Sequence, residues 1–374
     1  MSNDREKSYV IFFKNRTTYV LGGEQVEQNQ DLKAMLNQMD APAFMVQNGT
    51  VCAVNAAAAQ YGITVSENIQ NFVLIGKEEY DHFTEGNLYL TLCLNGVKFD
   101  CSVIKLQNGD LFTLEEAPVQ AELQALSLAA KQLSFPLSEL SILFDRSSEI
   151  ESSKKEKINQ TLFRLHRIIN NMADTVQIQN NLQHLKTIEL CSAVEEILEK
   201  AKTLLSCAET NVIYDLPNKA IYTLASVDLL ERAIYNLLSN AAKYTAGDIE
   251  ITLSQVDRKV YLTVKNRLKG ISGELYGRIF SRYKRKPGLE DPSCGLGLGM
   301  TFVHAAAKAH RGTVLVESPA ENEIKITMSL SIQQQKSTDV RSTIMKPDIY
   351  GGRDRALVEL SDVLPSHLYN SDKF

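Results

Sequence analysis

The 374-residue sequence contains no run of 18 consecutive apolar residues, so it predicts no transmembrane helix. Residues 1–9 are polar and do not resemble a signal peptide. The six cysteines form no C-x-x-C pair, which argues against a disulfide framework or a zinc site and fits a reducing compartment. A net charge of −5 argues against a general binder of nucleic acids or anionic membranes. We therefore expect a soluble, cytoplasmic protein.

The length and an apolar content of 44% predict two or three globular domains. Residues 1–30 form an N-terminal segment, and residues 31–117 have the pattern of a small α/β unit. Asn-Gly pairs between apolar runs are a strong hairpin signal. They occur at Asn48-Gly49, Asn95-Gly96 and Asn108-Gly109. The last two pairs link three expected strands, at residues 88–94, 97–104 and 111–114.

Residues 118–186 carry two heptad patterns separated by a polar turn. The first consists of Leu123, Leu126, Ala130, Leu133, Leu137, Leu140 and Phe144. The second consists of Ile158, Leu162, Leu165, Ile169, Met172 and Val176. Two such helices predict an antiparallel hairpin, and because one hairpin leaves part of its apolar seam uncovered, we expect a homodimeric four-helix bundle. The alternative is an internal hairpin packed on the flanking domains.

Residues 187–332 return to an α/β pattern. Helices are expected at residues 193–205 and 301–310, and strands at residues 211–214, 248–253, 260–264, 313–317 and 323–331. Residues 333–374 form a polar tail. Within it, residues 353–364 alternate charged and apolar side chains, as a short docking helix would.

Residues 236–245 and 295–299 have the features of a nucleotide site. The first stretch places Asn236, Asn240, Lys243 and Tyr244 at helical spacing. The second is the glycine run Gly295-Leu296-Gly297-Leu298-Gly299, a loop that opens a helix. An amide oxygen suits a metal ion, a lysine suits a phosphate, and the N–H groups at a helix start suit an anion.

This order of segments resembles a bacterial sensor histidine kinase over residues 31–332. The resemblance implies a multidomain α/β protein: a PAS-like α+β sensor with an unknown small ligand, a dimerising hairpin, and a GHKL (Bergerat) α/β sandwich that binds ATP and Mg²⁺. Residues 229–245 match the N box of that family almost residue by residue. On that match Asn240 is the Mg²⁺ ligand with Asn236 beside it, Lys243 reaches a phosphate and Tyr244 lines the nucleotide.

Two further segments resemble boxes of the same family. Residues 279–285 resemble the F box that begins the lid over ATP, so the resemblance implies that Phe280 and Tyr283 anchor the lid while Arg282 and Arg285 meet phosphates. The glycine run matches the G2 box, where glycine permits the close backbone approach of a phosphate cradle.

The G1 box departs from the family pattern. The family places an aspartate after a strand, followed by two glycines, and that aspartate accepts a hydrogen bond from the adenine amino group. Here Asn266 replaces the aspartate, Leu268 replaces the first glycine, and Gly270 remains. Asparagine still offers a carbonyl oxygen but no charge, so we expect weakened adenine binding.

The phosphoacceptor motif departs further. The family reads H-E-x-R-x-P, and aligned on Pro136 this chain has Lys131 in place of the histidine and Gln132 in place of the acid. A protonated ammonium is no nucleophile, and glutamine is no general base, so histidine phosphorylation at this position should fail. His166, His304 and the other histidines are expected to be surface or hydrogen-bonded helix residues.

Three functions follow from these patterns. The first is a pseudokinase: a two-component signalling protein that dimerises, binds MgATP and acts on a response regulator or an authentic histidine kinase. The second is an active kinase that phosphorylates a partner protein. The third is a non-catalytic scaffold with a dead nucleotide site, which the altered G1 box favours.

Overall fold

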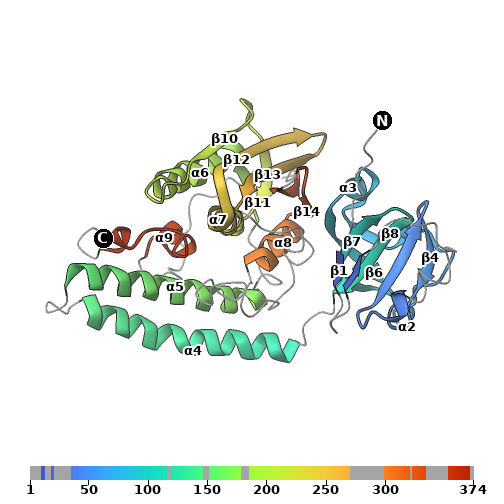
Figure 1. Cartoon of the computed structure of the whole chain (residues 1–374), viewed down its shortest axis with the longest axis horizontal. Helices are drawn as coiled ribbons and strands as arrows, with labels where there is room; N and C mark the ends of the chain where they lie inside the picture. The colour runs from blue at the N-terminus through green and yellow to red at the C-terminus, as the bar shows by residue number, and fades with distance from the viewer. Residues whose placement is uncertain are drawn as a thin grey trace. The chain divides into compact units, whose positions relative to one another are not determined.

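The computed structural model describes residues 10–12, 18–20, 35–115, 120–145, 151–177, 185–269, 299–320, 322–333 and 353–370. The chain divides into two compact units (Figure 1). The first contains the described residues up to 115 together with residues 311–318, and the second contains the remainder. In the described part of the chain, no helix is both long enough and apolar enough to cross a membrane.

The first unit is built on an antiparallel sheet in the order β4-β3-β8-β7-β6. Its strands are β3 (Ala43–Gln47), β4 (Thr50–Val54), β6 (Asn87–Leu94), β7 (Val97–Leu106) and β8 (Gly109–Glu115). The other edge of β6 pairs with β14 (Val314–Glu317) and β5 (Val73–Ile75). Short helices are α2 (Ala56–Ala59), η1 (Ile69–Asn71) and α3 (Lys77–Asp81). A separate pair joins β1 (Val10–Phe12) and β2 (Thr18–Val20).

Two of the three predicted Asn-Gly turns form as two-residue hairpin loops. Asn48 and Gly49 have φ of 51° and 75°, and Asn95 and Gly96 have φ of 49° and 80°, the left-handed conformation of a type I′ turn. At the third site the strand pairing runs to Leu106 opposite Gly109, so the glycine begins β8 instead of closing the loop. The apolar side of the sheet buries Phe44 against Phe112, with ring centroids 4.9 Å apart.

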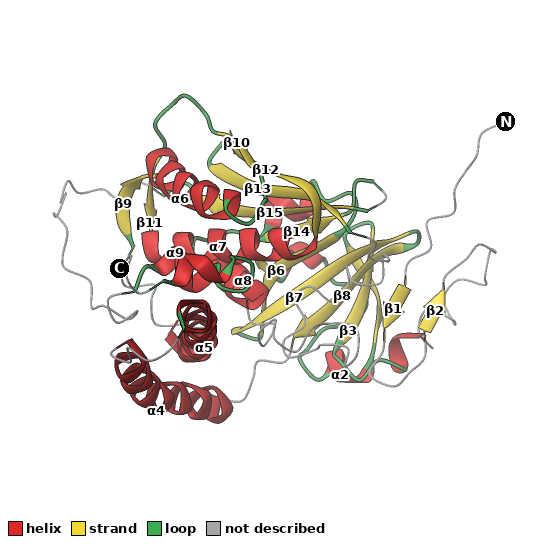
Figure 2. Cartoon of the chain, turned by 60° about the vertical axis from the view of Figure 1, so that its left-hand side comes forward, coloured by secondary structure: helices red, strands yellow, loops and turns green. Residues whose placement is uncertain are grey.

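The second unit contains a helical hairpin, α4 (Gln120–Asp145) and α5 (Ser152–Gln177), whose helices lie side by side (Figures 1 and 2). Its seam buries only part of each heptad: Ala130, Leu137, Leu162, Ile169 and Met172 pack together. Other seam residues stay open to solvent, with Leu133 49%, Leu140 59% and Leu165 41% exposed.

The rest of the second unit is a sheet covered by helices. The strands β10 (Val212–Asp215), β12 (Thr245–Val256), β13 (Lys259–Leu268) and β15 (Glu323–Ser331) pair in that order, with β10 parallel to β12. The helices are α6 (Leu190–Ser206), α7 (Val227–Tyr244) and α8 (Gly299–Ala309). A second pair joins β9 (Lys186–Glu189) and β11 (Tyr222–Ala225). Figure 2 shows α6 and α7 against one face of this sheet.

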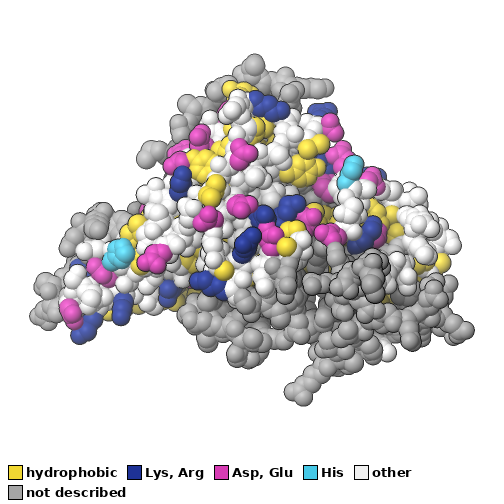
Figure 3. Space-filling view, turned by 45° about the horizontal axis from the view of Figure 1, so that its top comes forward, with side chains coloured by type: hydrophobic (Ala, Val, Ile, Leu, Met, Phe, Trp, Pro, Cys, Tyr) yellow, Lys and Arg dark blue, Asp and Glu magenta, His cyan; other side chains and the backbone are white. Residues whose placement is uncertain are grey.

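The sequence specifies these elements locally. Buried and exposed residues alternate along β12 and β13, which is the period-2 pattern of a sheet with one covered face. Glu189 begins α6 by accepting hydrogen bonds from the backbone N–H groups of Cys191 and Ser192, and Ser226 begins α7 by accepting from Leu229. On the face shown in Figure 3, basic and acidic side chains are interspersed.

The C-terminal segment, defined here as residues 353–370, belongs to the second unit. It contains α9 (Arg355–Glu359), capped by the Asp354 carboxylate, and the short helix η5 (Ser366–Tyr369). It packs on α5, α6 and α7. The docking helix expected at residues 353–364 is therefore shorter than predicted, at five residues.

Candidate functional site

The last turns of α7 place the four predicted N-box residues on one side of that helix. Asn236 is 1% exposed, whereas Asn240, Lys243 and Tyr244 are partly exposed. The opposite side of α7 holds the helix in the core through buried residues such as Ile234 and Leu238. The packing thus fixes Asn240 and Lys243 one turn apart at an accessible surface.

Asn236 links α7 to α5 by a hydrogen bond and lies against the start of α8. Its Nδ2 donates to the carbonyl oxygen of Arg232 at 2.9 Å, and its Oδ1 accepts from Nη2 of Arg167 in α5 at 3.2 Å. A Cβ at Gly299, the first residue of α8, would lie 2.5 Å from that Oδ1. A larger residue at Gly299 would therefore displace the Asn236 side chain. This close approach explains why a glycine suits the last position of the glycine run.

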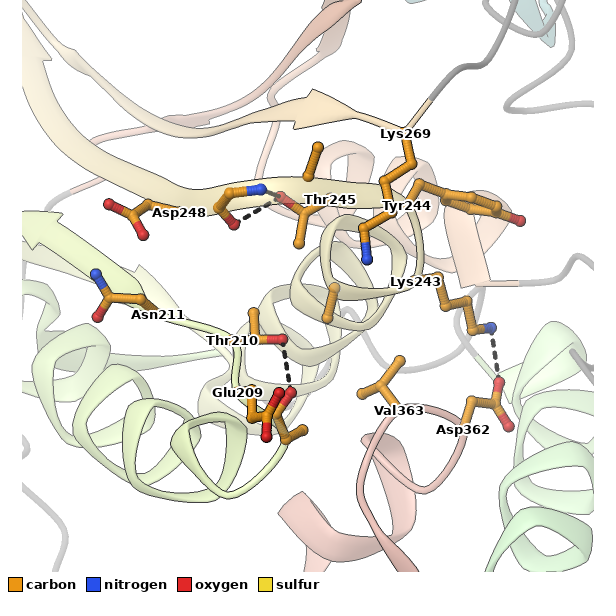
Figure 4. A pocket seen from close by; sticks show the side chains of 14 residues that line it. Glu209, Thr210, Asn211, Lys243, Tyr244, Thr245, Asp248, Lys269, Asp362 and Val363 are labelled. Atoms are coloured by element: carbon orange, nitrogen blue, oxygen red, sulfur yellow. Dashed lines mark hydrogen bonds and ion pairs between the residues drawn. The ribbon is translucent and has the colours of Figure 1, made fainter.

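Lys243 does not stand free at this surface. Its Nζ lies 2.7 Å from Oδ2 of Asp362 in the C-terminal segment (Figure 4). The same carboxylate lies 2.7 Å from Nη1 of Arg167. Burial alone would raise the pKa of Asp362, but the charges of Arg167 and Lys243 outweigh it and hold that pKa below its ordinary value. Asp362 is therefore ionised at neutral pH.

A polar pocket of about 670 Å³ opens at the C-terminal end of α7. Lys243, Tyr244 and Lys269 line it together with Asp362, as Figure 4 shows. The backbone N–H of Lys269 donates to the carbonyl oxygen of Tyr244 at 2.9 Å, which ties the end of β13 to the end of α7. The pocket shares Lys243 and Tyr244 with the predicted nucleotide site.

The altered G1 box lies within β13. Asn266 is 5% exposed and pairs with Ile324 in the ladder to β15. The strand continues through Leu268, which is 9% exposed, whereas the family pattern has glycine at that position. Burial of the Leu268 side chain favours continuation of the strand at this position. The backbone therefore lacks the conformational freedom that a glycine would give it.

Several predicted site residues lie outside the part of the chain that the structure describes. They are Gly270, Phe280, Arg282, Tyr283, Arg285, Gly295, Leu296, Gly297 and Leu298. Lys131 lies in α4, but its side chain also falls outside the described set; Gln132 beside it is exposed. The roles of these residues stay predictions.

The environments predicted for the histidines are confirmed for His310 but not for His166. His310 is buried and hydrogen-bonded as expected: its Nδ1 lies 2.7 Å from the Ala306 carbonyl oxygen, and its Nε2 accepts from the Ser226 N–H at 3.1 Å. For His166 the expectation of a surface or hydrogen-bonded side chain is wrong. This residue is 6% exposed, and among the described residues its Nε2 has no hydrogen-bond partner. It faces the packed side of α5.

Sequence reasoning missed a cluster of buried charges beside Asn236. Glu359 is 0% exposed, and its two carboxylate oxygens lie 3.1 Å from Nε of Arg232 and 3.5 Å from Nε of Arg167. Arg232 also donates to Asn171 at 3.0 Å. The charged residues between apolar ones at 353–364 indicated a docking segment, but nothing in the sequence identifies which cations they meet.

Comparison with known proteins defines the class. Residues 225–334 match the family described as "Histidine kinase-, DNA gyrase B-, and HSP90-like ATPase". The chain is 27% identical over 225 residues to Sensor histidine kinase RppB of Synechocystis sp., covering 57% of this chain and 50% of RppB. It is 30% identical over 215 residues to Adaptive-response sensory kinase SasA of Crocosphaera subtropica, covering 52% of this chain and 55% of SasA. The chain spans about half the length of these curated relatives.

Among solved structures, full-length ShkA in complex with AMPPNP aligns with a TM-score of 0.46 and 17% identity, over 57% of this chain and 46% of ShkA. The sequence matches show that residues 225–334 form a histidine kinase-like ATPase domain. Over about half of its length the chain is similar to bacterial sensor histidine kinases.

Proposed function

We propose that this protein is a dimeric, histidine-kinase-like signalling protein that binds MgATP and does not phosphorylate itself on the usual histidine. The observation that carries the proposal is α7, where Asn240, Lys243 and Tyr244 reach one accessible surface inside the ATPase-like domain. Oxygen from an amide suits Mg²⁺, and an ammonium suits a phosphate. Asn240 would hold the metal ion, and Lys243 would pair with a negatively charged phosphate of the nucleotide.

The missing phosphoacceptor makes it a pseudokinase. Lys131 stands where the family has its histidine, and an ammonium has no free lone pair to attack a phosphate. In the described part of the hairpin the histidine is His166, which is buried on the side of α5 that carries Arg167 and Asn170. An imidazole that is 6% exposed is not accessible as a nucleophile in this arrangement. The output is then a protein contact, with a response regulator or an authentic histidine kinase as the partner, and the PAS-like unit binds a small ligand.

The exposed half of the seam supports dimerisation. Leu133 and Leu140 on α4 and Leu165 on α5 belong to the same heptad as the buried residues, yet each is at least 41% exposed. A second copy of the hairpin would cover these side chains in a four-helix bundle. Burying a leucine contributes about 1.5–3 kcal/mol, so the three residues favour association.

Replacing Leu140 with aspartate is expected to weaken the dimer. A carboxylate in the seam would be desolvated without a partner, so the dissociation constant should rise by about tenfold or more. Sedimentation equilibrium of the full chain measures this change. Leu74→Asp is the matched control, because Leu74 is 46% exposed in β5 of the first unit. A monomeric parent chain, or a Leu140 variant that dimerises like the control, would contradict the proposed bundle.

Titration of the full chain with MgATP in a calorimeter should show saturable binding that Asn240→Ala weakens about tenfold or more. The alanine removes the oxygen proposed to hold the metal, and one contact to a charged group is worth about 1.5–3 kcal/mol. Asn71→Ala is the control, since Asn71 is an exposed asparagine in η1 of the first unit.

The same samples distinguish the alternatives. The pseudokinase predicts binding without acid-labile phosphate on the chain after incubation with ATP, and robust acid-labile autophosphorylation would refute it. Phosphate transfer to an added candidate partner would indicate an active kinase. Absence of binding at millimolar nucleotide, in the parent and in the Asp362 variant introduced below, would leave a scaffold whose altered G1 box no longer holds adenine.

A further inference from the structure

The C-terminal segment is anchored firmly beside the N-box helix. Figures 1 and 2 both show α9 next to α5 and α7. Its residues Leu357 and Leu360 are buried, and so is Tyr369, whose ring meets that of Phe163 edge-on at a centroid distance of 4.9 Å. The Tyr369 hydroxyl donates to the Leu357 carbonyl oxygen at 2.9 Å, so the two short helices brace each other.

Polar side chains of α5 hold the loop between these helices. Gln160 Nε2 donates to the carbonyl oxygen of Leu364 at 2.6 Å, and Arg164 Nε donates to that of Ser361 at 3.0 Å. Residue 362 lies between these two contacts. The loop geometry therefore fixes the position of the Asp362 carboxylate, instead of leaving it to swing on the surface.

That position is at the cations of the N-box surface. Asp362 is 7% exposed and lies 2.7 Å from both Lys243 Nζ and Arg167 Nη1, while Arg164 Nε is 4.0 Å away. Arg167 in turn donates to Asn236. Glu359 holds Arg232 and Arg167 from the other side. The positive charge next to Asn236 thus already has carboxylate partners within the chain.

Carboxylates and phosphates compete for the same donors. Both offer oxygens to lysine and to the forked guanidinium of arginine, in contacts of similar length. If Lys243 pairs with a phosphate, as the proposed function requires, its contact with Asp362 must break or be shared. An ion pair that is 11% and 7% exposed is little screened, so it competes effectively.

We propose that the C-terminal segment is an autoinhibitory element, in which Asp362 occupies the phosphate-binding position at Lys243 and Arg167 and must leave before a nucleotide binds fully. This inference rests on the proposed function, because it names a regulator of the same site. In the structure the segment is docked and the phosphate-binding position is occupied by Asp362. In the state that binds nucleotide, the segment has left Lys243 and Arg167. Apparent affinity falls in proportion to the fraction of released chains.

The coupling works in both directions. If the docked segment weakens nucleotide binding, then nucleotide binding weakens docking by the same factor. A partner that captures residues 353–370 would open the site, whereas a ligand that stabilises docking would close it. The bistable element is short, and its amides at Leu357, Val358 and Leu360 are hydrogen-bonded within the segment or its cap.

The test compares MgATP affinity in the full-length parent, Asp362→Asn and Asp354→Asn. Asparagine at 362 keeps the shape but removes the charge, so the affinity should rise about tenfold or more. Asp354→Asn is the matched control: it removes a carboxylate of the same segment that pairs with Lys200, and asparagine still caps α9. The control should bind MgATP like the parent. Tyr369→Ala is a second variant that loosens docking far from Lys243, and it should also increase affinity.

Amide hydrogen exchange of residues 355–364 gives a readout independent of affinity. MgADP at a concentration near the Kd of the parent should accelerate exchange there in the parent and much less in Asn240→Ala. Equal affinity of parent, Asp362→Asn and Tyr369→Ala, with exchange unaffected by nucleotide, would overturn autoinhibition while the proposed function stands. If none of these chains binds nucleotide, the proposed function itself fails.

Discussion

Replacing Glu359 with alanine is expected to lower the free energy of unfolding of the second unit by about 3–5 kcal/mol. The Glu359 carboxylate is 0% exposed and faces two arginines whose side chains are each 8% exposed, Arg232 and Arg167. Removing it leaves two cations in a desolvated site with one fewer anion. Arg232 keeps contacts to neutral groups, among them the Phe302 ring 4.3 Å from the guanidinium carbon.

Urea unfolding followed by pulsed hydrogen exchange in peptides of α7 and α9 measures this loss without mixing the two units. Glu151→Ala is the control, because Glu151 is 66% exposed and pairs with Lys154 at the surface, where an ion pair contributes under about 1 kcal/mol. Glu359→Gln keeps the shape of the side chain but not its charge, so its loss of stability should lie between those of Glu359→Ala and Glu151→Ala. A Glu359→Ala loss as small as that of the control would show that the arginines find other partners.

The local features of this fold were predictable because they depend on neighbours in the sequence. Asn95-Gly96 forms its turn because both residues tolerate positive φ, and α7 begins at Ser226 because its hydroxyl accepts the Leu229 N–H. The four N-box side chains share one side of α7 for the same reason: helical spacing alone determines it. From such local features the sequence predicts the α/β organisation and the residues at the centre of the candidate site.

The charge cluster was not predictable, because its partners are far apart in the chain. Arg167 and Asp362 are separated by 195 positions, and Arg232 and Glu359 by 127. Periodicity shows that a segment has an apolar side, but it does not identify the surface that this side meets. The seam of the hairpin illustrates the same limit: the heptad marks Leu140 and Leu137 alike, yet one is 59% exposed and the other 6%.

The stability of the second unit should fall as the pH decreases from 6.5 to 4, and His166 should contribute on the order of 2 kcal/mol to this loss. Burial first, and then the positive charge of Arg353, lower its pKa to about 4. Arg353 belongs to the C-terminal segment, where its guanidinium also lies 5.6 Å from the centre of the Phe163 ring. Docking of that segment thus brings a cation toward an imidazole that must stay neutral.

The sign follows from proton uptake. Between pH 6.5 and 4 the unfolded chain protonates its histidine while the folded chain does not, so acid favours unfolding and the stability is complete only above pH 6.5. The pKa of Asp362 is lowered below the ordinary value of a carboxylate, so its contribution to stability is lost only at lower pH. The pH range in which His166 destabilises the fold is therefore separate from the range in which Asp362 does. Urea unfolding of α5 at pH 7, 5.5 and 4.5 should show the full slope in the parent and in His82→Leu, an exposed control, and a smaller slope in His166→Leu, where buried His310 still has a lowered pKa. A slope as steep in His166→Leu as in the parent would assign the acid sensitivity to another group, such as His310.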